Sequence, residues 1–81
     1  MYYTYVIKSL KSDYYYKGHC LDLEARLIQH NSGKTTSNRA YAPFHIVYFE
    51  QFQTREEAMQ REKYFKSSAG RRYLKTRILK I

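Results

Sequence analysis

The segment that ends at Gly18 constrains the fold most, because two strand-like stretches follow each other there across a short polar turn. Tyr2 to Lys8 is rich in aromatic and β-branched residues, as strands are, and Tyr14 to Gly18 is predicted to be a second strand. The stretch between them, Ser9 to Asp13, is polar and typical of a turn. We therefore expect the two strands to form an antiparallel hairpin.

The register of this hairpin decides which tyrosines lie together. Side chains alternate between the two faces of a strand, so Tyr5 shares a face with Ile7 on the first strand, and Tyr16 shares a face with Gly18 on the second. If the numbers of paired residues sum to an odd number, for example with Tyr5 opposite Tyr16, the two tyrosines lie on the same side of the sheet. We predict a register of this kind.

The middle of the chain predicts a helix, a loop and a third strand. Asp22 is a candidate N-cap for a helix that runs to about Asn31, and Gly33 is the expected C-terminal stop. A polar loop is expected from Lys34 to Pro43, and the third strand from His45 to Gln51.

The last third of the chain predicts two helices. A capping box at Thr54 to Glu57 opens a helix that we expect to end near Lys66, before a break at Ser67 to Gly70. A final basic helix is predicted from about Arg71 to Ile78. The order β-β-α-β-α-α indicates an α/β (α+β) fold in which about three helices pack on a three-stranded sheet. A chain of 81 residues has room for one hydrophobic core, so we expect one domain over residues 1–81.

The chain is strongly basic, with 15 Lys and Arg residues against 7 Asp and Glu residues and a formal net charge of +8. The C-terminal stretch 63–81 contains no acidic residue, and its basic residues are Lys63, Lys66, Arg71, Arg72, Lys75, Arg77 and Lys80. A basic field of this density favours a polyanionic partner, because it attracts phosphates and releases their condensed counterions. We favour nucleic acid over an anionic membrane, since the sequence has no long apolar run.

Cysteine usage and the N-terminus bear on the compartment. Cys20 is the only cysteine, which excludes an internal disulfide, and no zinc-type spacing of Cys and His occurs. The N-terminal residues are too polar and too few to form a secretory signal. We expect a cytoplasmic protein that is a monomer and has no membrane partner.

Glu62 is the sharpest anomaly in the helical pattern. At about 100° per residue it falls between Phe65 on one side and Met59 on the other, where residues that face the sheet are expected. An ionised carboxylate at such a place costs several kcal/mol unless a cation or hydrogen bonds compensate. It is either a structural salt bridge, with Arg26 or Lys66, or a ligand for a divalent ion such as Mg²⁺. Since no other carboxylate is well placed, we expect one ion rather than two.

Arg26 and His30 lie four residues apart on the first predicted helix, and therefore on one face of it. The guanidinium of an arginine fits phosphate oxygens and stabilises charge that builds on phosphorus. A histidine can donate to a phosphate or relay a proton near neutral pH. The alternative for each is an ordinary surface residue on an amphipathic helix.

Tyr5, Tyr16 and Gly18 are the candidates on the two strands. A tyrosine with its usual pKa of about 10 is a poor base at neutral pH, unless a metal or an arginine favours the phenolate. The alternative is a buried strand tyrosine whose hydroxyl is satisfied. Gly18 leaves room for a backbone or a phosphate to approach closely. The candidate contacts to a nucleic-acid backbone are Lys17, Gly18, Arg39, Lys66, Arg71 and Arg72.

Taken in this order, the motifs resemble those of the GIY-YIG nuclease superfamily, in particular its minimal single-domain members of the small bacterial type. Tyr3-Thr4-Tyr5 stands where that family has its first motif, and Tyr16-Lys17-Gly18 where it has its second. Leu21 to Gly33 is similar to the family's helix with its arginine and histidine. Glu57 to Lys66 is similar to the segment with the metal-binding glutamate. The similarity runs from Tyr2 to at least Lys66.

The resemblance implies a three-stranded antiparallel sheet flanked by helices, and a metal-dependent endonuclease that hydrolyses one phosphodiester strand of DNA with a single Mg²⁺ or Mn²⁺ ion. Carried over by position, Glu62 would hold the metal, Arg26 would stabilise the pentacovalent phosphorus, and His30 would assist. Either Tyr5 or Tyr16 would activate the water, and the resemblance does not choose between them.

Two residues depart from the family pattern. Tyr3 replaces the glycine of the first motif and Lys17 replaces the aliphatic residue of the second. Both positions tolerate substitution, and all five polar side chains of the motifs remain.

We expect a role in DNA repair or recombination with selectivity for DNA structure. Two alternatives stay open: a binding module of the same fold that is weakly active or inactive, and a basic RNA-associated protein whose tyrosines stack on single-stranded bases.

Overall fold

The computed structural model describes the backbone of residues 1–81 and all side chains except those of Thr36 and Ser37. Its sheet has three antiparallel strands in the order β2-β1-β3, with the bounds β1 (Tyr2–Ser9), β2 (Tyr15–Cys20) and β3 (Phe44–Phe52). The predicted three-stranded antiparallel sheet and the order β-β-α-β-α-α are thus confirmed.

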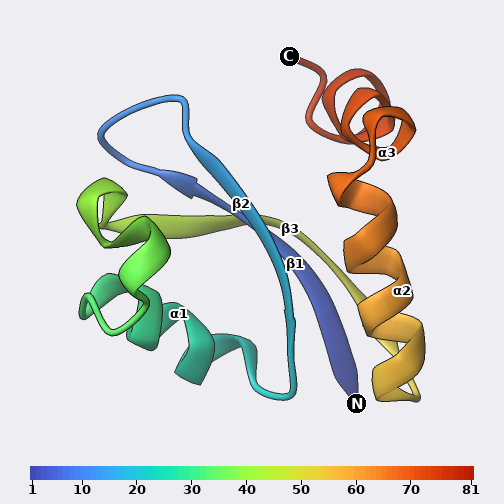
Figure 1. Ribbon diagram of the computed structural model, residues 1–81, viewed down its shortest axis with the longest axis horizontal. Helices are drawn as coiled ribbons and strands as arrows, with labels where there is room; N and C mark the ends of the chain where they lie inside the picture. Colours follow the sequence, from blue (N-terminus) through green and yellow to red (C-terminus); the bar gives the residue numbers. More distant parts are fainter.

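Helices cover both faces of this sheet (Figure 1). One face packs against α1 (Leu23–Asn31) and the short 3₁₀-helical segment η1 (Thr36–Tyr41). The other face packs against α2 (Arg55–Lys66), α3 (Ser68–Tyr73) and a terminal π-helical segment, η2 (Leu74–Ile78). None of the helices in the described part of the chain has the length and apolar character of a membrane span.

Alternation along β1 gives each face its own core. Tyr5 and Ile7 point to the α1 side and pack with Phe44, whereas Val6 points to the α2 side and packs with Phe65. All five side chains are at most 2% exposed. Burying a residue of this size stabilises the folded state by about 1.5–3 kcal/mol, so β1 is the shared centre of the fold.

The hairpin has the predicted parity of pairing but not the pairing given as an example. Tyr5 lies opposite Gly18, and Ile7 lies opposite Tyr16. The paired numbers therefore sum to 23, which is odd, and Tyr5 and Tyr16 share the α1 face as predicted. The two tyrosines are not directly opposite each other, because the hairpin closes where the Ser9 amide donates to the carbonyl of Tyr14 at 2.9 Å.

Local signals set the ends of α1 and α2. The Asp22 side chain accepts a hydrogen bond from the Ala25 amide at 3.1 Å, and Gly33 follows the helix with a φ of +79°. Thr54 and Glu57 form the predicted capping box at the start of α2. These caps agree with the sequence-based boundaries, because each depends only on neighbouring residues.

Two segments differ from the expectation. The stretch Lys34 to Pro43, expected to be a polar loop, contains η1. The break expected over Ser67 to Gly70 is confined to Ser67, whose hydroxyl accepts from the Gly70 amide at 3.1 Å and so starts α3 three residues early. Gly70 also lets α3 pack against the end of α2, since a Cβ there would lie 1.8 Å from the Tyr64 carbonyl oxygen.

Arg61 fixes α2 on the sheet and thereby orients the next residue, Glu62. Its guanidinium donates to both carboxylate oxygens of Glu50 on β3, with Nε 2.8 Å from Oε1 and Nη2 3.2 Å from Oε2. The same group lies 4.7 Å from the ring centroid of Phe65 and 5.1 Å from that of Tyr64. A forked ion pair that also stacks on aromatic rings holds a rigid geometry.

Candidate active site

The edge strand β2 divides the candidate site into two halves. Its alternate residues Tyr16 and Gly18 point to the α1 face, whereas Lys17 and His19 point to the α2 face. Side chains from β1 and α1 join the first half, and side chains from α2 and α3 join the second.

The first half is a buried hydrogen-bond network of four side chains, Tyr5, Arg26, His30 and Asn38, which we call the phenol–imidazole network. The Tyr5 hydroxyl lies 2.9 Å from His30 Nε2 and 3.3 Å from Arg26 Nε. His30 Nδ1 lies 3.4 Å from Asn38 Oδ1. Tyr5, His30 and Asn38 are at most 1% exposed. The structure therefore brings Tyr5 together with Arg26 and His30, whereas Glu62 is not part of this network.

One donor in this network is fixed by its chemistry. Arg26 Nε is always a donor, so it donates to the oxygen of the Tyr5 hydroxyl. That oxygen has a second lone pair and the hydroxyl has one hydrogen, so the contact with His30 Nε2 can run in either direction. His30 Nδ1 lies 3.2 Å from Asn38 Nδ2 and 3.4 Å from Asn38 Oδ1, and each tautomer of the imidazole uses one of these two contacts.

The pKa directions indicate the charge state of the network. Burial raises the pKa of Tyr5 to about 12, although the hydrogen bond and the positive charge of Arg26 lower it in part. Burial lowers the pKa of His30 below its usual value, the hydrogen bond with Asn38 raises it in part, and the charge of Arg26 lowers it. Near pH 7 the network is a neutral phenol and a neutral imidazole beside a guanidinium cation.

Tyr16 lies at the border between the two halves of the site. Its ring centroid is 5.0 Å from that of His30 and 6.3 Å from that of Tyr5. On its other side, Lys66 Nζ is 5.7 Å from the ring centroid of Tyr16. Tyr16 is partly exposed, unlike Tyr5, so its hydroxyl is the more accessible of the two phenols.

Gly18 has a defined structural task in this arrangement. A Cβ at Gly18 would lie 2.5 Å from the Tyr5 hydroxyl oxygen and 3.1 Å from a ring carbon of Tyr16. The absence of a side chain lets the Tyr5 ring lie across β2 and reach His30. The close approach that we expected Gly18 to allow is thus made by the phenol of Tyr5.

Glu62 lies in the second half, on the α2 side of β2. Its Oε1 is 2.6 Å from His19 Nδ1 and its Oε2 is 2.6 Å from Lys66 Nζ. Burial raises the pKa of Glu62, but the hydrogen bonds from Lys66 and His19 more than offset this, so its pKa is lower than usual and it is ionised near pH 7. Of the two salt-bridge partners expected from the sequence, Lys66 is present and Arg26 is not.

Glu62 is less deeply placed than the sequence pattern predicted. Phe65 is fully buried as expected, but Met59 is 46% exposed, and the Glu62 side chain is 19% exposed. The sheet-facing stripe of α2 is therefore narrower than predicted and leaves Glu62 at its edge, partly open to solvent. An edge position explains how an ionised carboxylate is accommodated there.

Glu62 can supply one carboxylate ligand to a divalent cation, and the remaining ligands must come from water and the substrate. The described residues contain no cluster of three His, Cys, Asp or Glu side chains that would hold a metal by themselves. Mg²⁺ is commonly held by one or two carboxylates, with water and substrate phosphates as the remaining ligands. Glu62 fits that mode, provided that Lys66 releases one of its oxygens.

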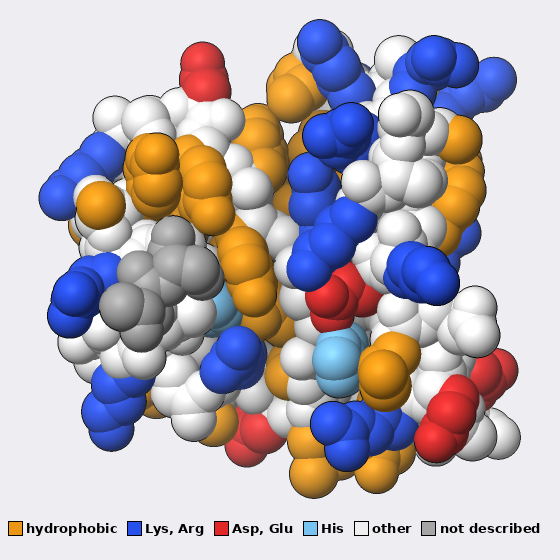
Figure 2. Space-filling model, in the orientation of Figure 1, with side chains coloured by type: hydrophobic (Ala, Val, Ile, Leu, Met, Phe, Trp, Pro, Cys, Tyr) orange, Lys and Arg blue, Asp and Glu red, His pale blue; other side chains and the backbone are white. Residues whose placement is uncertain are grey.

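Cations surround this carboxylate on α2, α3 and β2. Burial lowers the pKa of Lys17, and the nearby charges of Arg71 and Lys66 lower it further, so these three groups lie close enough to repel one another. We call Lys17, His19, Glu62, Lys66 and Arg71 the charged wall. Figure 2 shows Lys and Arg side chains gathered on the α2 and α3 side of the hollow that separates the two helical layers.

The other two predicted backbone contacts lie apart from the charged wall. Arg39 is on η1, where its side chain lies against Gly33 on the α1 side of the molecule. Arg72 is exposed on α3. Neither is drawn into the network or the wall.

His19 and Asn38 belong to the site but were not among the residues that the sequence predicted. The first of them, His19, lies on β2. It follows the second tyrosine motif directly, but its partner Glu62 is 43 positions away in the chain. The available signal was its alternation with Gly18 along β2, which places it on the face opposite the tyrosines.

Known proteins resemble this chain over most of its length. The model of a family described as "GIY-YIG catalytic domain" matches residues 1–75. The chain is 44% identical over 66 residues to a UPF0213 protein of Bacillus pumilus, which covers 80% of this chain and 66% of that protein. It is 35% identical over 74 residues to the UPF0213 protein SSP2268 of Staphylococcus saprophyticus, which covers 90% of this chain and 89% of that protein.

A third relative is the UPF0213 protein YazA of Bacillus subtilis, 40% identical over 63 residues, which covers 76% of this chain and 63% of that protein. The chain thus spans about two thirds of the length of the Bacillus relatives it matches. These names state no activity. No solved structure matches the chain at a significant level.

Proposed function

The chain belongs to the GIY-YIG catalytic-domain family, and from this premise we propose that it is an endonuclease that hydrolyses a phosphodiester bond in DNA with the help of one Mg²⁺ or Mn²⁺ ion. One observation carries the proposal: the Tyr5 hydroxyl holds the His30 imidazole at 2.9 Å and the Arg26 guanidinium at 3.3 Å, beside the accessible phenol of Tyr16. Hydrolysis of a phosphodiester needs a cation that stabilises the charge on the phosphoryl oxygens and a group that orients the attacking water.

Arg26 stabilises the charge that develops on the phosphoryl oxygens. Its Nε is held by Tyr5 and its Nη1 donates to Gln29 Oε1 at 2.8 Å, so the fork is fixed before a substrate arrives. The hydrogen bond with Tyr5 raises the pKa of Arg26, although burial alone lowers it, and the group stays fully charged. A preorganised cation lowers the barrier without reorganising during the reaction.

We assign the role of orienting the attacking water to Tyr16 rather than to Tyr5. The Tyr5 hydroxyl is held by Arg26 and His30, the residue is 1% exposed, and its pKa is raised to about 12. Tyr16 is partly exposed at the border of the two halves, where its hydroxyl can accept a hydrogen bond from water. Tyr5 and His30 then position Arg26 and support the ring of Tyr16.

Glu62 is the residue that would hold the ion, with water and phosphate oxygens as the other ligands. When bound, the ion would draw negative charge from the phosphoryl and leaving oxygens. Lys66 occupies one carboxylate oxygen of Glu62 and lies against Tyr16, so it can turn from the carboxylate to a substrate phosphate.

A second candidate is supported by the same contacts. Both oxygens of Glu62 are engaged, one by His19 and one by Lys66, which suits a module that binds nucleic acid without cutting it. Such a module would use the charged wall for affinity and would have no need of a metal.

Nicking of supercoiled plasmid separates the two candidates. The reactions contain Mg²⁺, Mn²⁺ or EDTA, and compare the wild type with Glu62→Gln and with Glu56→Gln. Glu56 is a matched control, because it is also on α2 but lines a separate pocket with Met59 and Gln60. The nuclease proposal expects metal-dependent nicking that Glu62→Gln abolishes and Glu56→Gln retains. Nicking that survives Glu62→Gln unchanged would refute the metal assignment and indicate a contaminating nuclease.

Substrate structure is tested with labelled oligonucleotides. Nicked, flapped and four-way DNA, together with single-stranded and duplex RNA, are compared at equal concentrations. A role in repair or recombination expects faster cleavage of a branched DNA than of a plain duplex. Tight binding of every substrate with no cleavage in either metal would favour the binding module.

A further inference from the structure

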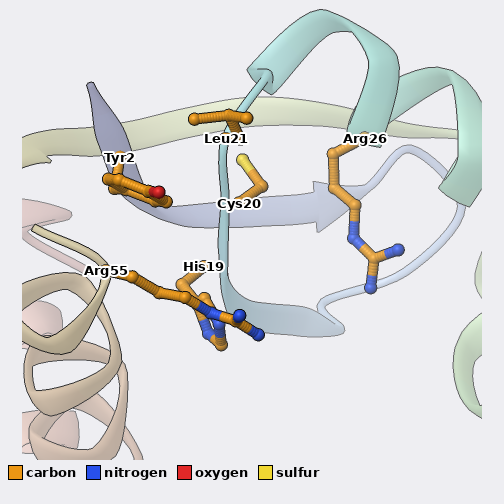
Figure 3. A pocket seen from close by; sticks show the side chains of 6 residues that line it. All are labelled: Tyr2, His19, Cys20, Leu21, Arg26 and Arg55. Carbon is orange, nitrogen blue, oxygen red and sulfur yellow. The ribbon is translucent and has the colours of Figure 1, made fainter.

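A pocket of about 390 Å³ lies beside the phenol–imidazole network, at the N-terminal end of α2. Its lining residues come from β1, β2, α1 and α2, and the turn after β2; they are Tyr2, His19, Cys20, Leu21, Arg26 and Arg55. Figure 3 shows the side chains of Arg26 and Arg55 reaching toward this space from the α1 side and the α2 side, with His19 next to Arg55. The pocket therefore connects the two halves of the site.

The two arginines of the lining have no carboxylate partner among the described side chains. His19, the other polar ring at the pocket, is hydrogen-bonded to Glu62 through Nδ1, and no Asp or Glu is among the lining residues. Arg26 donates only to the neutral groups of Tyr5 and Gln29. Among the described side chains, no ion pair or hydrogen bond involves Arg55, so its guanidinium has all its donors available.

Four carboxylates on the neighbouring segments do not line the pocket. Asp22 caps α1 through the Ala25 amide. Glu57 is part of the capping box with Thr54. Glu56 lines the separate pocket on α2. Glu62 contacts His19, but it shares its charge with Lys66. Two guanidinium groups around one cavity repel each other unless an anion lies between them, and the fork of an arginine fits phosphate oxygens.

We infer that this pocket binds a second phosphate of the substrate strand, the one next to the phosphodiester that is cut, between Arg26 and Arg55 with His19 as a third donor. The inference rests on the proposed function, which places the scissile phosphate at Arg26. Because Arg26 belongs to both the network and the pocket lining, the two phosphates lie within reach of one arginine side chain and are neighbours on the strand. Arg55 is then a binding residue that sets the path of the strand.

Binding is measured without cleavage, in the full chain with Glu62→Gln and with EDTA present, by the fluorescence anisotropy of a labelled flapped DNA. Arg55→Gln is compared with Lys63→Gln, which removes the same charge from the same helix but on the side of the separate pocket. We expect Arg55→Gln to weaken binding about tenfold and to reduce the slope of log K against log salt by about one, as expected for one lost phosphate contact. Lys63→Gln should weaken binding less than about twofold.

A chemical change in the DNA identifies the phosphate. Neutral methylphosphonates replace the phosphates one at a time around the cleavage site. We expect one flanking position at which the replacement weakens binding of the Arg55 protein but does not weaken Arg55→Gln further. Such non-additivity shows that the arginine and that phosphate contact each other.

Three results would overturn the inference. Arg55→Gln could bind like its parent, Arg55→Gln and Lys63→Gln could weaken binding equally, or no methylphosphonate position could couple to Arg55. Inorganic phosphate is titrated separately by NMR. If phosphate shifts the Arg55 and His19 signals while Arg55→Gln leaves the DNA affinity unchanged, the pocket binds free anions and not the strand. A wild type that cuts DNA while Arg55→Gln binds normally would refute only the subsite. A wild type that never cuts, with the Arg55 effect intact, would refute only the nuclease proposal.

Discussion

The two sides of β2 use the same strand in opposite ways. On the α1 side, the phenol–imidazole network is buried, neutral except for Arg26, and fixed by mutual hydrogen bonds. On the α2 side, the charged wall is half-exposed and made of ion pairs and repelling cations. Tyr16 touches both, through His30 and Lys66.

This difference separates two physical tasks that act on one substrate. A buried network keeps its geometry because unpaired polar atoms inside a protein are costly, so it suits the positioning of reacting groups. An exposed cationic surface gains affinity by counterion release and tolerates rearrangement, so it suits the capture of a polyanion. Substitutions on the α1 side should therefore change stability and rate, and those on the α2 side should change affinity and salt dependence.

The largest expected effect separates the two tyrosines. Tyr16→Phe should lower the cleavage rate by about 10²–10⁴, because it removes the group that orients water, and should leave the unfolding free energy nearly unchanged. Tyr5→Phe should cost about 1–3 kcal/mol of stability, because Arg26 and His30 lose their shared partner. Single-turnover cleavage and urea unfolding of both variants measure the two quantities. A rate loss for Tyr5→Phe that exceeds that for Tyr16→Phe would reverse the assignment.

Gly18→Ala should destabilise the protein by about 1–3 kcal/mol, because the new methyl group would lie 2.5 Å from the Tyr5 hydroxyl oxygen and must displace it. Thermal unfolding followed by circular dichroism measures the loss. Lys17→Ala, on the next residue but the other face, is the control and should change stability little. Equal stability of Gly18→Ala and the wild type would show that the network is loosely packed.

The pH dependence of stability probes His30. Burial lowers its pKa when the chain is folded, whereas the pKa of a histidine in the unfolded chain is about 6.5. The stability that depends on the neutral ring is therefore present above that pH and is lost as the pH falls through the lower folded pKa, by at most about 1.4 kcal/mol per pH unit. Urea unfolding between neutral and mildly acidic pH should show a weaker dependence in His30→Gln. The control His45→Gln, at an exposed residue of β3, should keep the wild-type dependence, and the idea fails if His30→Gln also keeps it.

The smallest expected effect concerns the charged wall. Arg71→Gln should weaken DNA binding a few-fold and reduce the salt slope by about 0.9, with no change in stability. Lys11→Gln, an equal charge change in the exposed hairpin turn, should leave the slope unchanged. Anisotropy titrations at several salt concentrations give both values. Identical slopes for the two variants would mean that affinity follows net charge and not the wall.

The sequence predicted those parts of the fold that depend on neighbouring residues. Each of these features depends on residues that are close in the sequence. They are the capping box of α2, the Asp22 cap of α1 and the strand alternation that places Tyr5 and Tyr16 on one face of the sheet. The same is true of the pair Glu62 and Lys66, which are one helical turn apart.

What the sequence could not predict depends on contacts between distant segments. The pairing of His19 with Glu62 requires β2 and α2 to be docked, and it decides that Glu62 lies across the edge strand from the network. The pocket between Arg26 and Arg55 appears only when the ends of α1 and α2 are placed beside β2.

The proposed mechanism requires that a guanidinium on one side of the edge strand β2 and a carboxylate on the other side act on the same phosphodiester bond. A double-mutant cycle of single-turnover DNA cleavage with Arg26→Gln, Glu62→Gln and the combined variant measures this directly. If both groups stabilise one transition state, the combined variant should be hardly slower than the slower single variant. Rate losses that multiply, or a Glu62→Gln variant as fast as the wild type, would contradict a shared site.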